Sequence, residues 1–166
     1  MANISQKAQA MPASAIRKLL PYAEAAKKTG VKVYHLNQGQ PDIKSPQCAL
    51  DAVRNFSQAN VSYSHSGGLM ELRKGLVEKY YKKIGIDICV DELIVTVAGS
   101  ESVNLALEIA CNPGDEVIVL EPFYTNYNTF AFMNGLTLKA IPTDIRKGFQ
   151  IPPIEEFEKA ITEKTK

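Results

Sequence analysis

The sequence has little of what marks metal, membrane and nucleic-acid proteins. Its 166 residues contain no tryptophan and only two histidines, and no carboxylate stands at metal-ligand spacing, so we expect no metal site. No apolar run approaches the length of a membrane span, and the N-terminus lacks the apolar core of a signal peptide. The net charge of +1, with both signs interleaved, predicts no nucleic-acid or membrane surface.

Cysteine is also scarce. Cys48, Cys89 and Cys111 are odd in number and widely spaced, and they form no Cys-x-x-Cys pattern. Such cysteines are typical of buried thiols in a reducing compartment, so we expect a cytoplasmic protein. The hydrophobic content of 45% is enough for a sizeable core.

Apolar runs alternate with helical patterns from residue 93 onward, which predicts an α/β fold with a parallel sheet covered by helices. We expect strands at 31–36, 93–98, 116–120 and 136–141. We expect a helix over 16–29 that Pro21 divides, and a helix with Ser45 as its N-cap. Further helices are expected at 69–84, 100–110, 126–133 and 152–161. The alternation predicts another strand after the last helix.

Gly99 is the most informative position. It ends the apolar run 93–98 and opens the amphipathic stretch 100–110. A strand that turns on glycine directly into a helix leaves free backbone N–H groups at the positive end of the helix dipole. The sequence therefore predicts a phosphate site at this turn. A plain N-capped helix is the alternative, since Ser100 is a good cap.

Several motifs together resemble the class I/II aminotransferases, which are fold-type-I pyridoxal-phosphate-dependent enzymes. They occur in the family's order and span nearly the whole chain. The motifs are 37–42 (NQGQPD), 63–68 (YSHSGG), 71–73 (ELR), 97–101 (VAGSE), 113–117 (PGDEV) and 121–124 (EPFY).

The resemblance implies the N-terminal part of a three-layer αβα large domain with a mostly parallel sheet, truncated at its C-terminal side. Residues 1–40 would form the N-terminal arm and the start of the small domain, and residues 41–166 would begin the large domain. In the family's sheet, 93–98 would not pair with 116–120.

The resemblance also implies site residues for the cofactor pyridoxal 5′-phosphate. The backbone of Gly99, Ser100 and Glu101, with the Ser100 hydroxyl, would cradle its phosphate. Tyr124 would stack on its ring, and Tyr63 would reach the phosphate of a partner subunit in a homodimer. Gly39 would line the carboxylate end of the substrate.

The family moves an amino group between an L-amino acid and a 2-oxo acid, in amino-acid metabolism and biosynthesis. This chemistry needs a lysine that forms a Schiff base with the cofactor. The sequence contains no Ser-x-x-Lys, and its lysines are typical of solvated helix faces, so we assign no catalytic residue and expect this chain alone to be inactive. Two alternatives stay open: a catalytically dead or split-subunit partner, and an unrelated nucleotide-binding α/β module.

Overall fold

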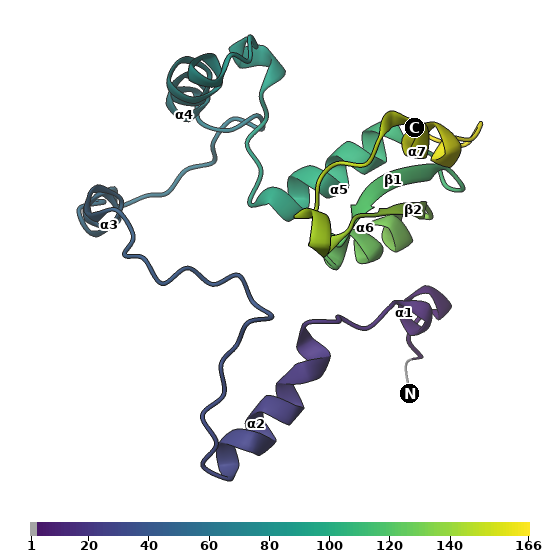
Figure 1. The fold of residues 1–166 in the computed structure, drawn as a ribbon. Helices are drawn as coiled ribbons and strands as arrows, with labels where there is room; N and C mark the ends of the chain where they lie inside the picture. The colour runs from purple at the N-terminus through teal and green to yellow at the C-terminus, as the bar shows by residue number, and fades with distance from the viewer. Residues whose placement is uncertain (1–2) are drawn as a thin grey trace. The chain divides into compact units, whose positions relative to one another are not determined.

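The computed structural model describes residues 3–166, and the chain divides into two compact units. The first unit runs to Gly39 and resumes over Ser102–Lys166, and the second is Gln40–Glu101. The assignment of residues 1–40 to an arm and a small domain, and of 41–166 to a large domain, stays a prediction. Figure 1 shows the elements of both units, and each unit is described by itself below.

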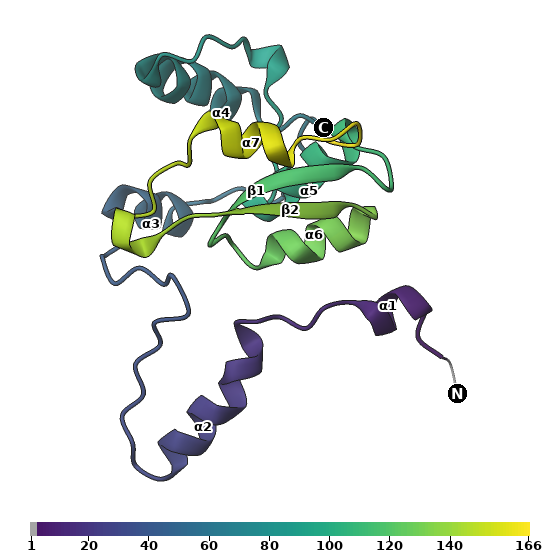
Figure 2. The same cartoon turned by 45° about the vertical axis from the view of Figure 1, so that its right-hand side comes forward.

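A strand–helix–strand motif organises the first unit (Figure 2). Strand β1 (Glu116–Glu121) and strand β2 (Thr137–Pro142) run parallel, with Glu116 opposite Thr137 and Glu121 opposite Pro142. Helix α6 (Asn126–Asn134) connects them and packs on β2. It ends at Gly135, whose φ of 69° is in the left-handed region that glycine tolerates. The predicted strands at 116–120 and 136–141 are confirmed within one residue.

Two further helices flank this motif. Helix α5 (Gly99–Ala110) precedes β1, and helix α7 (Ile154–Ala160) follows the turn η5 (Ile145–Lys147) and contacts β2. The predicted helices at these positions are confirmed, with α7 shorter than expected.

The chain after α7 begins a further parallel pairing. Thr165 forms a parallel bridge with Glu116, whose backbone N–H donates to the Lys164 carbonyl at 2.8 Å. The Lys166 N–H donates in turn to the Glu116 carbonyl at 3.1 Å. These contacts lie on the edge of β1 that β2 does not use.

The carboxylate of Glu116 strengthens this edge. It accepts a 2.7 Å hydrogen bond from the Thr162 hydroxyl and lies 3.5 Å from the Lys139 ammonium. The hydroxyl bond, and then the lysine charge, lower the pKa of Glu116 from its ordinary value. The ionised form therefore ties the C-terminal segment to the start of the sheet.

The N-terminal part of the first unit is helical. It contains α1 (Gln6–Ala10), the turn η1 (Arg17–Leu19) and α2 (Leu20–Lys28). Pro21 lies in the first turn of α2, where its missing N–H costs no hydrogen bond, so the predicted division at this proline is confirmed. The Lys7 ammonium donates to the Met133 carbonyl at 2.6 Å, which joins α1 to the end of α6.

The second unit consists of helices and loops. It begins with α3 (Gln47–Arg54), followed by α4 (Met70–Gly75). The wider π-helical turns of η2 (Leu76–Tyr81) and the tight turn η3 (Lys82–Ile84) extend α4, so the predicted helix over 69–84 is confirmed as one helical run. The last short turn is η4 (Val90–Glu92).

Two predicted strands are wrong. Residues 31–36 and 93–98 form no strand in the described chain, although Leu93 has an extended backbone. A strand needs a neighbour for its backbone groups. The Val95 N–H donates to the Gly67 carbonyl at 3.0 Å instead, and the Val97 N–H donates to a carboxylate.

Two local predictions are also wrong. Ser45 does not cap α3, because the capping position is Pro46, whose carbonyl accepts the first helical N–H groups. The cysteines are not buried: Cys48 and Cys89 are exposed and Cys111 is half-buried.

The expected sizeable core is not formed either. In the described residues the buried apolar side chains are Ala131, Leu136 and Ile141, all on α6 and β2 or between them. Many large apolar side chains are exposed, among them Leu36, Val97 and Ile109. No helix of residues 3–166 is long and apolar enough to cross a membrane.

Candidate functional site

The first turn of α5 carries the predicted phosphate site. Gly99 is the first helical residue, and the N–H groups of Gly99 and Ser100 meet no acceptor within residues 3–166. A Cβ added at Gly99 would meet nothing within 4 Å, so the space beside this turn is open. Two free donors at the start of a twelve-residue helix form a site with positive potential.

Glu101 takes a different part in this turn. Its backbone N–H donates to the Ala98 carbonyl at 3.0 Å, and its carboxylate accepts the Val97 N–H at 2.6 Å. The carboxylate therefore holds the backbone that leads into the helix. In this conformation Gly99 and Ser100 are the donors open to an anion, and a role for Glu101 in cofactor binding stays a prediction.

The same unit contains Tyr63, whose side chain is fully exposed. Tyr63 precedes a tight loop in which the Gly67 N–H donates to His65 Nδ1 at 3.1 Å and the Gly68 N–H donates to the His65 carbonyl at 2.8 Å. A role for the exposed Tyr63 hydroxyl toward a partner subunit stays a prediction.

The loop at Gly67–Gly68 packs directly on Val95, in the segment before the predicted phosphate site. Gly68 has a φ of +98°, and a Cβ added there would lie 2.6 Å from the Val95 Cβ. The Gly67 carbonyl accepts the Val95 N–H at 3.0 Å. Glycine is therefore required at residue 68, both for its backbone conformation and for the close approach of Val95.

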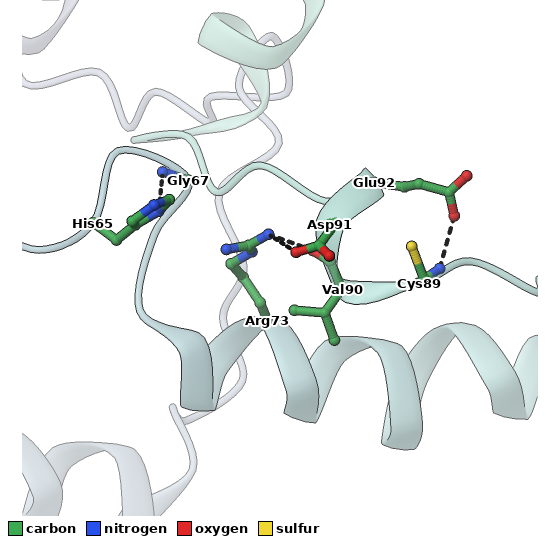
Figure 3. Close-up of polar contacts among 7 residues, drawn as sticks. All are labelled: His65, Gly67, Arg73, Cys89, Val90, Asp91 and Glu92. Atoms are coloured by element: carbon green, nitrogen blue, oxygen red, sulfur yellow. Dashed lines mark hydrogen bonds and ion pairs between the residues drawn. The ribbon is translucent and has the colours of Figure 1, made fainter.

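A buried arginine lies beneath this loop. Arg73, on α4, is 5% exposed, and its Nη2 donates to the Val90 carbonyl at 2.5 Å. The same nitrogen lies 3.6 Å from the carboxylate of Asp91, a side chain that is 93% exposed. The Arg73 Nε is buried and has no acceptor within the described residues. Figure 3 shows the guanidinium pointing from the helix toward Val90 and Asp91.

The turn η4, whose Val90 carbonyl accepts the hydrogen bond from Arg73, is also held by a cap between Cys89 and Glu92. The Cys89 N–H donates to the Glu92 carboxylate at 2.8 Å, in a reciprocal cap of η4 (Figure 3). This backbone hydrogen bond, followed by the contact with the Cys89 side chain, lowers the pKa of Glu92 from its ordinary value.

Sequence reasoning missed the part that Arg73 plays. Arg73 belongs to the 71–73 motif, but it was assigned no role there. A signal was present, because Arg73 falls on the helical stripe of Leu69, Leu72, Leu76 and Val77, at the i+4 position from Leu69. A cation on the apolar stripe of a helix predicts a buried, hydrogen-bonded charge.

The remaining candidates belong to the first unit. Gly39 is exposed, and a Cβ added there would meet nothing within 4 Å. Tyr124 follows β1 and is 48% exposed. Its hydroxyl accepts a 2.6 Å hydrogen bond from Asn126, and its ring packs edge-on against Tyr127 at 5.7 Å.

The neighbouring aromatic rings take a packing role. Phe123 stacks on Tyr127 at 6.3 Å with an interplanar angle of 8°, and Tyr127 also contacts Phe130. Both Phe123 and Tyr127 are half-buried, whereas Tyr124 is more exposed. Of the three, Tyr124 therefore has the ring most available for stacking on a ligand. No cluster of three or more His, Cys, Asp or Glu side chains suited to a metal occurs in residues 3–166.

Known proteins match this chain along its length. A family model described as "Aminotransferase class I and II" matches residues 31–166. The aspartate/prephenate aminotransferase of Thermus thermophilus is 32% identical over 100% of this chain and 43% of its own length. The chain thus spans less than half the length of the curated relatives it matches.

Solved structures give the same result. A mutant of Thermus thermophilus aspartate aminotransferase has a TM-score of 0.89 and 33% identity, covering 100% of this chain and 44% of that one. The alanine aminotransferase from Pyrococcus furiosus has a TM-score of 0.85 and 32% identity, covering 98% and 42%. These matches support an α/β fold with a parallel sheet, of which this chain holds a part.

Proposed function

The chain belongs to the class I and II aminotransferases, and from this premise we propose that it supplies the phosphate-binding part of a pyridoxal 5′-phosphate site. The whole enzyme would transfer an amino group between an L-amino acid and a 2-oxo acid. The observation that carries the proposal is the pair of free N–H groups of Gly99 and Ser100 at the start of α5.

The residues present fit the phosphate end of this cofactor. A phosphate dianion needs several donors and positive potential, and the start of α5 offers two backbone N–H groups, the Ser100 hydroxyl and the helix dipole. The open space at Gly99 lets the anion approach the backbone. The carboxylate of Glu101 is engaged by Val97, which supports a turn that keeps its donors exposed.

The other residues would bind and orient. The half-exposed ring of Tyr124 would hold the pyridine ring in plane and exclude water from one face. Tyr63 would donate its hydroxyl to the phosphate of a second subunit in a homodimer, and Gly39 would let backbone approach the substrate carboxylate. When bound, pyridoxal 5′-phosphate supplies an electron sink that stabilises negative charge on the substrate carbon.

We propose that this chain by itself does not transaminate, because none of its lysines stands in a Ser-x-x-Lys motif. A catalytically dead or split-subunit partner would also be inactive by itself. A nucleotide-binding module would differ, because it would not bind pyridoxal 5′-phosphate in preference to a nucleotide.

The binding part is tested by titrating the 15N-labelled chain with pyridoxal 5′-phosphate, inorganic phosphate, pyridoxal and ATP. We expect the first two to shift the amide signals of Gly99 and Ser100, and pyridoxal, which lacks the phosphate, to leave them in place. Gly99→Pro removes one donor at a position where a helix tolerates proline, so phosphate binding should weaken. Ser57→Ala, at an exposed loop serine, is the matched control.

Two results would contradict the proposal. A preference for ATP over pyridoxal 5′-phosphate at the Gly99 amide would favour the nucleotide-binding module. Borohydride reduction that fixes the cofactor to one defined lysine, together with amino transfer to a 2-oxo acid, would refute the proposed inactivity.

A further inference from the structure

We propose that Arg73 is a positioning residue of the phosphate site. Its guanidinium fixes the Gly67–Gly68 loop against Val95, and thereby sets the position of the backbone that ends in Gly99. This inference rests on the function proposed above for the first turn of α5. All the residues involved lie within Gln40–Glu101, the second unit.

The first step is the contact between Arg73 and the loop. A Cβ added at Gly67 would lie 3.2 Å from Arg73 Nη1 and 3.3 Å from His65 Nδ1. Gly67 therefore leaves the guanidinium just enough room to lie against its backbone. Figure 3 shows the His65–Gly67 hydrogen bond beside the guanidinium.

The second step is the hydrogen bond to the turn η4. Arg73 Nη2 donates to the Val90 carbonyl, so one side chain joins the loop before α4 to the turn that leads into 93–98. Val90 is five residues before Val95, which is itself bonded to Gly67. Arg73, Gly67 and Val95 thus close a small ring of contacts, and the chain reaches Gly99 four residues later.

The third step concerns the partners of the buried Arg73 guanidinium, which only partly compensate its charge. The guanidinium has one neutral carbonyl and one largely exposed carboxylate as partners, and its buried Nε has none in the described chain. A buried charge so partnered contributes little net stability, because desolvation offsets its contacts. An apolar side chain of similar length would fill the same space. What arginine adds is a planar guanidinium, whose N–H groups donate in fixed directions.

The experiment compares the 166-residue chain with Arg73→Met, which keeps length and burial, and Arg73→Lys, which keeps charge but loses the fork. Arg54→Met removes an exposed arginine of the same unit and is the control. Amide hydrogen exchange is measured at Val95 and Gly68, and the Gly99 amide is titrated with pyridoxal 5′-phosphate and with inorganic phosphate.

In Arg73→Met we expect exchange at Val95 and Gly68 to accelerate by about tenfold or more, and phosphate affinity to fall by a similar factor. Arg73→Lys should restore part of both effects. Exchange in α6 and β2 should not change, because these elements do not depend on Arg73. Arg54→Met should match the unsubstituted chain within about twofold.

Three results would contradict this inference or the function on which it rests. If the unsubstituted chain binds phosphate and Arg73→Met binds it equally well, Arg73 is a packing residue and this inference is wrong. If exchange at Val95 is the same in both chains, the anchoring itself is refuted. If the unsubstituted chain binds neither pyridoxal 5′-phosphate nor phosphate while Val95 exchange still depends on Arg73, the proposed function fails and the phosphate part of this inference fails with it.

Discussion

The strand–helix–strand motif of the first unit and the loop–helix assembly of the second are stabilised by different forces. The motif buries apolar side chains, Ala131, Leu136 and Ile141, under parallel strands. The second unit buries a cation, Arg73, and closes its loops with hydrogen bonds and glycine contacts.

The difference explains where the chemistry is proposed to lie. Apolar burial is non-directional and tolerates small shifts, so it suits a scaffold. Hydrogen bonds and close glycine contacts hold one geometry, which suits the presentation of backbone donors to an anion. The phosphate turn at Gly99 follows the second kind of structure.

The largest effect is expected for Ile141→Ala in β2. Ile141 is 5% exposed, so truncation should cost about 2–4 kcal/mol of unfolding free energy, measured by urea unfolding with amide exchange. Val95 exchange in the second unit should be unaffected. Ile109→Ala, at an exposed isoleucine of α5, should stay within about 0.5 kcal/mol. Equal acceleration at Val95 would mean that the two regions unfold as one.

Gly68→Ala should act on the other region. A Cβ at a φ of +98° and 2.6 Å from Val95 should cost about 2–3 kcal/mol and accelerate exchange at Val95, with β1 and β2 unchanged. Gly75→Ala, in the same unit, is the matched control. Gly75 is helical with open space at its Cβ, so alanine there should stabilise by about 0.5–1 kcal/mol. A neutral Gly68→Ala would show that the loop does not press on Val95.

Lowering the pH should weaken each region at a different carboxylate, Glu116 in the first unit and Glu92 in the second. The pKa of Glu116 is lowered by the Thr162 hydroxyl, so its contribution is complete above the unfolded value of about 4.3 and is lost as the pH falls through the lower folded value. We expect faster exchange of the Lys166 amide over this range, alongside the 13C titration of the Glu116 carboxyl.

Two variants separate this effect from its counterpart in the second unit. Glu116→Gln should abolish the acid dependence at Lys166 and leave the turn at Cys89 unchanged. Glu92→Gln should do the reverse, since the pKa of Glu92 is lowered by the Cys89 N–H. Acid dependence at Lys166 that survives Glu116→Gln would assign it to another group.

The smallest effect is expected for Asp91→Asn. The Asp91 carboxylate is 93% exposed and 3.6 Å from Arg73, so its ion pair is screened by water and should contribute less than about 0.5 kcal/mol. Urea unfolding with Val95 exchange checks this value. A loss as large as that of Arg73→Met would mean that charge pairing, rather than the bond to the Val90 carbonyl, holds the guanidinium.

Sequence patterns predicted the strand–helix–strand motif of the first unit and the helical run of the second, but not how the loops of the second unit are held. The runs at β1 and β2 and the helix between them are local signals, and glycine at residue 135 marked the end of α6. The run 93–98 is also rich in apolar residues, yet it forms no strand in the described residues, and Gly67 and Glu101 accept hydrogen bonds from its Val95 and Val97 N–H groups. The Gly67 carbonyl is distant from Val95 in the sequence, and the Glu101 acceptor is a side-chain carboxylate. Neither kind of partner is visible in the periodicity of apolar residues.

The candidate site divides in the same way. The sequence by itself determined that a glycine begins α5 with free donors, because that depends on neighbouring residues alone. It also determined the parallel strands and their connecting helix. Only the tertiary structure decided that Arg73 is buried beneath Gly67, that Glu101 turns its carboxylate to Val97, and that most large apolar side chains remain uncovered. Burial and hydrogen-bond partners are set by residues that meet in space, and spacing along the chain does not specify which ones meet.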